Sequence, residues 1–315
     1  MNISKKALMS FLMTLTSLIA MAQPYYHVMK RDGINQTEEA AYNAKKYKIK
    51  VDMDGPRPKD AIGGRITIES YECDRSPLKR SFYFTKHGNV YYNNSEGKFH
   101  LEKSQLDYPE GTPNPNHRGY YTYSKDHCGH FRWGRTIAEC IDDSENYSSL
   151  YYDATETDFY FANPNNLPKL QEDLGNEKWA VLSFCEWDYV CKTLGMNGWS
   201  IDGNRCFLLD LTPDKSLLRA ILKENGSLNM TKEQFVHYEA QGLVCLPAPG
   251  TRYGSDIVAV HKVHYHINYW SCTPCEYFPT TNSWTVHFSF SCEPVGWEGY
   301  DRGVAYPVRL VILAD

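Results

Sequence analysis

The sequence has no basic stripe and, beyond its first 22 residues, no long apolar run. Its 315 residues include 33 Lys and Arg against 38 Asp and Glu, which gives a formal net charge of −5. Because several clustered cations are needed to neutralise a phosphate backbone, we expect no nucleic-acid partner. The later apolar runs are too short for a helix that crosses a bilayer, so we expect no transmembrane segment after residue 22.

The common catalytic signatures are also missing. The sequence contains no HExxH, no GxSxG, no P-loop and no glycine-rich dinucleotide turn. We therefore predict no catalytic residue, no bound metal and no cofactor. Calcium and zinc remain alternatives that no motif supports. Enzyme activity is left open, with a binding role favoured.

The first 22 residues have the three parts of a secretory signal peptide. Lys5 and Lys6 precede an apolar run over residues 7–21, and small residues flank the expected cleavage point in Ala20-Met21-Ala22. Gln23 follows where a lipid-modified protein would have Cys. We therefore predict export, to the periplasm, the cell surface or the medium.

Cysteine is abundant, with ten residues after residue 22. Export permits disulfides, but a chain this long does not need them, so the sequence leaves their formation and pairing open. Cys206 and Cys245 lie within apolar runs, which predicts buried thiols that act as small hydrophobic residues.

Cys272-x-x-Cys275 allows two readings besides ordinary thiols or a tight disulfide. One is a redox pair, although such a pair usually lies at a helix N-terminus. The other is a zinc site formed by these cysteines together with His261, His264 or His266. The simpler interpretation is that the three histidines lie on the surface of a strand.

Short strands with helices between them predict an α+β fold. Aromatic and β-branched runs bounded by Asn and Gly predict strands at residues 65–68, 81–84, 89–92, 98–101, 243–247, 269–271, 284–290 and 308–312. In residues 284–290 the alternation places Val286 on one face and Thr285 on the other. We divide the chain into a signal peptide (1–22), an N-terminal extension (23–79) and a main domain (80–315).

Two helices are predicted by capping boxes. Ser183 and Glu186 form the first box, before a helix that ends at Gly195. Thr231 and Gln234 form the second, before a helix that stops near Gly242. A third, weaker helix is expected between them, with its apolar positions at residues 217, 218, 221 and 222.

The order of motifs is similar to a known family. The matching segments are Phe82-Tyr83-Phe84, Gly88 to Tyr92, Gly97-Lys98-Phe99, Arg132-Trp133-Gly134, Asn163-Pro164-Asn165-Asn166, Leu182 to Trp187, Glu233-Gln234-Phe235, Gly242 to Arg252, Tyr269 to Pro274 and Val308 to Val311. The chain thereby resembles the exported Bacteroidetes "major paralogous domain" proteins, in the formylglycine-generating-enzyme-like branch of the C-type-lectin-like fold. The resemblance covers about residues 80–313 and departs at Arg132, where the family has Gly.

The resemblance implies a C-type-lectin-like domain with long loops and a binding face near its C-terminus. Tyr and Trp are favoured at recognition surfaces, so we expect Tyr277, Trp297, Tyr300 and Arg302 to contact a ligand. C-type lectins that bind sugars through calcium use a Glu-Pro-Asn motif. This chain has Glu293-Pro294-Val295 and therefore lacks the Asn ligand of that motif.

We therefore predict an exported, non-enzymatic module that recognises a glycan or a protein at the cell surface. A Cys- or metal-dependent enzyme centred on Cys272 and Cys275 is one alternative, and a structural subunit of a surface appendage is another. The sequence leaves the ligand and the oligomeric state open.

Overall fold

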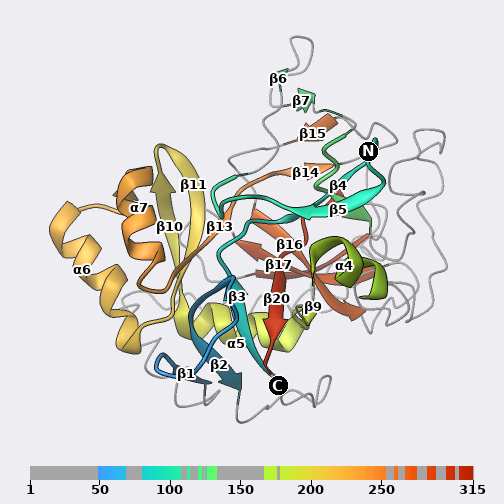
Figure 1. The fold of residues 1–315 in the computed structure, drawn as a ribbon. Coiled ribbons are helices and arrows are strands. Elements are labelled where there is room, and N and C mark those ends of the chain that lie inside the picture. Colours follow the sequence, from blue (N-terminus) through green and yellow to red (C-terminus); the bar gives the residue numbers. More distant parts are fainter. Residues whose placement is uncertain are drawn as a thin grey trace, which may run out of the picture. The chain divides into compact units, whose positions relative to one another are not determined.

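The described part of the chain combines four helices with many antiparallel strands, which confirms the α+β prediction (Figure 1). The computed structural model describes residues 49–68, 80–107, 112–113, 120–122, 124, 126–132, 167–175, 178–252, 259–261, 267–274, 282–288, 296–301 and 305–314. All of them belong to one unit, Ala40–Asp315. Among them no helix is long and apolar enough to cross a membrane.

A five-stranded antiparallel sheet brings the two ends of this unit together. Its strands, in spatial order, are β1 (Ile49–Asp52), β2 (Ala61–Ile68), β3 (Ser81–Thr85), β20 (Leu310–Leu313) and β9 (Trp179–Val181). The C-terminal strand β20 lies between β3 and β9. Strands β1 and β2 come from the segment that we treat as an extension. β1 pairs with β2, and β2 pairs with β3.

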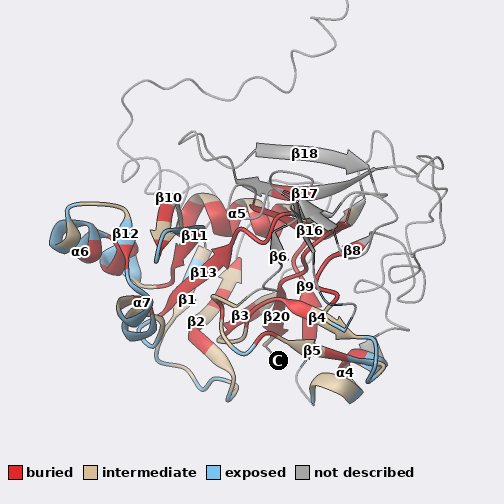
Figure 2. Ribbon diagram, turned by 90° about the horizontal axis from the view of Figure 1, so that it is seen from above, coloured by how far each residue is buried: buried red, intermediate tan, exposed pale blue. Residues whose placement is uncertain are grey.

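Two helices connect strands of a second sheet, and each helix has exposed residues. Its order is β12 (Asn229–Met230), β10 (Gly195–Ile201), β11 (Asn204–Asp210) and β13 (Leu243–Pro247). The short turn η2 (Pro213–Lys215) leads into α6 (Ser216–Asn225), and α7 (Lys232–Glu239) precedes β13. Figure 2 shows β13 buried, whereas α6 and α7 present exposed residues. The third predicted helix is therefore confirmed as α6.

The remaining strands form smaller sheets. One has the order β6 (Thr112–Pro113), β7 (Tyr120–Thr122), β15 (Ala259–His261), β14 (Thr251–Arg252), β19 (Ala305–Tyr306) and β8 (Phe131–Arg132). Another has the order β16 (Ile267–Pro274), β17 (Asn282–Phe288) and β18 (Gly296–Asp301). Strands β4 (Val90–Asn93) and β5 (Lys98–Leu101) form a hairpin, and α4 (Leu167–Leu174) contacts β5.

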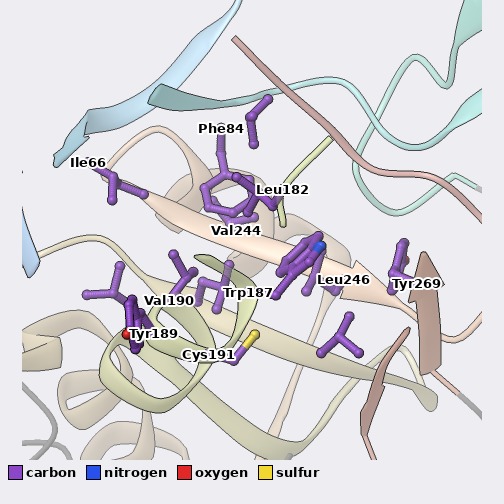
Figure 3. Close-up of a cluster of buried hydrophobic side chains, with 14 of the residues drawn as sticks. Ile66, Phe84, Leu182, Trp187, Tyr189, Val190, Cys191, Val244, Leu246 and Tyr269 are labelled. Atoms are coloured by element: carbon purple, nitrogen blue, oxygen red, sulfur yellow. The ribbon is translucent and has the colours of Figure 1, made fainter. Parts of the chain in front are cut away.

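Helix α5 (Phe184–Leu194) lies in the main core. Its capping box is present as predicted: the Ser183 side chain accepts from the Glu186 N–H, and Glu186 accepts from the Ser183 N–H at 2.7 Å. Trp187 is fully buried, with ring centroids 6.2 Å from Phe84 and 6.3 Å from Tyr269 (Figure 3). The second predicted box, at the start of α7, is also confirmed.

The same Glu186 carboxylate connects α5 to the start of β3, the central strand of the first sheet. Its side chain is fully buried, and it accepts hydrogen bonds from two nitrogens of Arg80, with Nε at 2.8 Å. Arg80 directly precedes β3 and also donates to the Val181 carbonyl at 3.2 Å. A buried carboxylate is tolerated only when it is paired and hydrogen-bonded, and here both conditions are met.

Both faces of strand β17 are covered. Thr285 and Val286 point to opposite faces, as the alternation in residues 284–290 predicts, and both are fully buried. Strand β17 lies between β16 and β18, and α5 also contacts it. The polar Thr285 side chain can lie on a covered face because a buried polar group is tolerated when it has hydrogen-bond partners.

The Glu186 contacts give a stability prediction. We expect Glu186→Ala to lower the free energy of unfolding by about 2–4 kcal/mol, because it leaves Arg80 and the Ser183 N–H without their buried acceptor. Glu172→Ala, at an exposed position of α4, is the control and should change it by less than about 0.5 kcal/mol. Denaturant unfolding measures both, and equal midpoints and slopes for the two variants would contradict this account.

Candidate functional site

The candidate site is a cavity of about 620 Å³ between the β4–β5 side of the molecule and the second sheet. It is lined by Tyr91, Leu101, Glu102, Lys103, Leu106, Asp107, His127, Ile201, Asp202, Asn204, Arg205, Cys206, Lys232, Cys245 and Pro247. The lining thus comes from the β4–β5 hairpin and the loop after it, the segment that carries His127, the tip of the β10–β11 hairpin, the start of α7, and β13.

The floor of the cavity is apolar and belongs to the sheet. Ile201, Cys206, Cys245 and Pro247 are all buried. Cys206 and Cys245 are free thiols, as predicted for buried cysteines in apolar runs. Burial raises the pKa of Cys206 well above its usual value, and a hydrogen bond with Cys245 raises it further. The Cys206 thiol therefore stays protonated, and both buried side chains pack as small hydrophobic groups.

A tight hairpin turn carries part of the rim. Ile201 pairs with Asn204, so Asp202 and Gly203 are the two central residues of the turn. Both have positive φ, 48° and 81° respectively, as a type I′ turn requires. The turn is held against α7, because the Lys232 N–H donates to Asp202 Oδ1 at 3.3 Å. Asn204 and Arg205 are thereby presented at the exposed mouth of the cavity.

The opposite wall is built from stacked rings and a carboxylate. The Tyr91 ring packs against His127, with centroids 4.0 Å apart, and against His100 at 5.2 Å. His127 Nε2 lies 2.5 Å from Glu102 Oε1, and Glu102 is buried. Burial, followed by the charges of Glu102 and Glu96, raises the pKa of Tyr91. The phenol therefore remains a hydrogen-bond donor at neutral pH.

Gln105 connects this wall to the floor. Its Oε1 accepts from the Cys245 N–H at 3.0 Å and from Arg309 Nη2 at 2.8 Å. Its Nε2 donates to Glu239 Oε1 at 2.8 Å, near the end of α7. The loop that carries Glu102, Lys103 and Leu106 is thus fixed to β13 by a buried side chain.

The residues that the sequence predicted as a binding face are not part of this cavity. Tyr277 and Arg302 lie outside the described residues. Trp297 and Tyr300 lie on β18, where their backbones pair with Val286 and Ser283, and their side chains are also outside the described part. The four ligand contacts therefore remain a prediction.

The cysteine and histidine alternatives can be examined only at Cys272. It is a free, partly buried thiol on β16, and burial raises its pKa to about 12, which is the opposite of an activated thiolate. Cys275, His264 and His266 lie outside the described residues, as does the side chain of His261. Within the described ranges no three His, Cys, Asp or Glu side chains gather as a metal site would need.

Among the described cysteines, one forms a disulfide. Cys185, in the first turn of α5, is disulfide-bonded. Its partner lies outside the described residues, since the other cysteines described, at positions 128, 191, 206, 245 and 272, are free. The disulfide question that the sequence left open is thus answered for Cys185.

None of the cavity residues was predicted as a site residue from the sequence, although one local pattern points to two of them. Asp202-Gly203 between two short apolar runs is the strongest short-range indication of a hairpin, and it would have placed Asn204 and Arg205 beside the turn. No local pattern could have indicated Glu102 and His127, because their contact joins segments 25 residues apart.

The cavity combines an apolar floor with a rim that offers both donors and acceptors. Such a lining suits a small ligand with an apolar body and polar edges. Comparison of the chain with protein-family models, with curated proteins and with solved structures finds no match. The cavity therefore has to be interpreted from its own chemistry.

Gln105 provides a test of how the wall is held. We expect Gln105→Ala to lower the free energy of unfolding by at least about 2 kcal/mol, because the buried Arg309 guanidinium and the Cys245 N–H both lose an acceptor. Gln241→Ala, at an exposed position after α7, serves as the control, with a change below about 0.5 kcal/mol. If thermal and denaturant unfolding place both variants at wild-type stability, Gln105 does not hold the wall.

Cys272 provides a test of the thiol chemistry. With a pKa of about 12, roughly one thiol in 10,000 is ionised at about pH 8, so Cys272 should not react with Ellman's reagent in the folded protein. Cys272→Ser should leave the folded-state thiol count unchanged and lower the count in denaturant by one. A fast-reacting thiol that this substitution removes from the folded protein would instead favour the enzyme alternative.

Proposed function

We propose that the chain is an exported, non-enzymatic module that recognises a glycan or a protein at the cell surface, and that a saccharide unit enters the cavity described above. The observation that carries the proposal is the lining of the cavity. A buried apolar floor faces an opening surrounded by an amide, carboxylates, amines and an imidazole.

This lining fits the chemistry of sugars. A saccharide presents hydroxyl groups at its edges and C–H groups on its faces, so it needs an apolar surface together with donors and acceptors. The floor at Ile201 and Pro247 supplies the first, while the amide of Asn204 supplies a donor and an acceptor at the rim. The Tyr91 ring packs on two imidazoles, so the hydroxyl rather than a free ring face is what Tyr91 offers a ligand.

The volume sets the scale of the ligand. A cavity of about 620 Å³ is within the usual range for small-molecule sites and accommodates a few sugar rings. The proposal therefore places the end of a chain, or a short branch, in the cavity. Longer glycans or a protein partner would extend over the surrounding surface.

The fold and the compartment are parts of the same proposal. We retain the C-type-lectin-like fold on the strength of the motif order, with the α+β architecture in agreement. We retain export on the N-terminal pattern, which the disulfide at Cys185 supports, because disulfides persist mainly in oxidising compartments. Trp297 and Tyr300 stay in the proposal as a second ligand-contacting face near β18.

The first test is a glycan and mucin array probed with residues 23–315, with and without calcium. Asn204→Trp adds a large ring at the exposed mouth, so we expect it to lower specific binding at least about tenfold. Lys223→Trp adds the same ring on α6, outside the cavity lining, and should bind like the wild type.

The alternatives give different results in this experiment. Binding that survives Asn204→Trp but is lost in Trp297→Ala and Tyr300→Ala would place the ligand on the second face and not in the cavity. No binding to any glycan in either condition would contradict a lectin role. Turnover of a bound glycan would contradict the non-enzymatic assignment.

A further inference from the structure

The cavity lining has as many acidic as basic side chains, but the two kinds differ in how many of them form hydrogen bonds within the protein. Three lining residues are acidic and three are basic: Glu102, Asp107 and Asp202, and Lys103, Arg205 and Lys232. A count of charges therefore predicts no preference for an anion or a cation. The hydrogen bonds and ion pairs of each group decide which charges are available to a ligand.

Each of the three carboxylates already accepts a hydrogen bond within the protein. Glu102 lies 2.5 Å from the His127 ring nitrogen, and it is buried behind it. Asp107 Oδ2 accepts from the Ser104 N–H at 3.1 Å, which closes the loop after β5. Asp202 Oδ1 accepts from the N–H of Lys232 at 3.3 Å. These carboxylates thus hold the walls of the cavity in place.

Two of the three basic side chains, Lys103 and Lys232, do not take part in such contacts within the described part of the protein. Lys103 and Lys232 are both exposed, and within the described ranges neither ammonium group forms an ion pair or a side-chain hydrogen bond. Their side chains approach the cavity from different elements, the loop after β5 and the first turn of α7. A ligand in the cavity therefore meets available positive charge on two sides.

We propose that the ligand of this cavity is an acidic saccharide, one that carries the carboxylate of a uronic acid. The inference rests on the proposed function and specifies its ligand class. The carboxylate accepts charge-assisted hydrogen bonds from Lys103 and Lys232 at the mouth, and the sugar ring covers the apolar floor at Ile201 and Pro247. Because the amines are exposed, their contribution falls with added salt.

Titration calorimetry with the mature chain tests this with three probes. They are an oligogalacturonate tetrasaccharide, the same tetrasaccharide with its carboxyl groups reduced to alcohols, and a sulfated form of that neutral product. We expect the uronate to bind at least about tenfold more tightly than the reduced form. Raising NaCl from about 50 to about 500 mM should remove most of that difference.

Substitutions locate the effect. Lys103→Gln and Lys232→Gln together should lower the affinity for the uronate about tenfold and leave the reduced form unaffected. Lys223→Gln removes one charge from exposed α6 outside the lining, and it should bind both probes like the wild type. Circular dichroism spectra and melting curves confirm that the variants are folded.

The outcomes separate this inference from the proposal beneath it. Equal binding of the uronate and its reduced form would overturn the acidic ligand and leave saccharide binding standing. Loss of uronate affinity in Lys223→Gln to the same extent as in the double variant would overturn it too, because the effect would come from net charge alone. If the sulfated form binds and the uronate does not, the ligand does not carry a carboxylate. If no probe binds and the glycan array shows no binding either, the proposed function itself is wrong.

Discussion

The arrangement of the cavity depends on one buried polar contact, between Gln105 and Arg309. Arg309 is fully buried just before the last strand, and burial lowers the pKa of its guanidinium to about 10, so it remains charged at neutral pH. A buried charge requires hydrogen-bond acceptors, and Arg309 Nη2 donates to Gln105 Oε1 and, at 3.0 Å, to the Thr85 carbonyl. The other two guanidinium nitrogens, Nε and Nη1, are buried without a hydrogen-bond partner in the described part of the chain, so Gln105 is one of only two acceptors there. The same Gln105 oxygen accepts from the Cys245 N–H. One amide side chain thus joins the C-terminal strand, the cavity wall and the cavity floor.

This contact explains why a polar site can lie directly on the core. Burial raises the pKa of Glu239, and the Gln105 amide and the charge of Arg309 act against that rise. The carboxyl end of α7, whose first turn carries Lys232, is thereby tied to the wall that carries Lys103. The loop that carries Lys103 and the helix that carries Lys232 are consequently held in place by hydrogen bonds of Gln105, and a site held in this way costs less ordering when a ligand binds.

The sequence predicts well what depends on neighbouring residues. Both capping boxes, the strands around Phe84 and Val244, and the buried thiols at positions 206 and 245 follow from patterns a few residues long. The cavity does not, because its key contacts join residues far apart in the chain, such as Gln105 and Arg309, which are 204 positions apart. The predicted face at Trp297 and Tyr300 remains a prediction.

The cysteines bear on the proposed compartment. An exported chain meets oxidants, yet Cys191, Cys206 and Cys272 all have raised pKa values because they are buried. Thiol oxidation and exchange proceed through the thiolate, so burial slows both and lets free thiols coexist with the disulfide at Cys185. Cys206 and Cys245 are diagonal partners on β11 and β13, since Cys206 pairs with Pro247 and Cys245 with Leu208. Diagonal positions are typically about 7–8 Å apart, at or beyond the Cα–Cα span of a relaxed disulfide, which fits the two free thiols in the floor of the cavity.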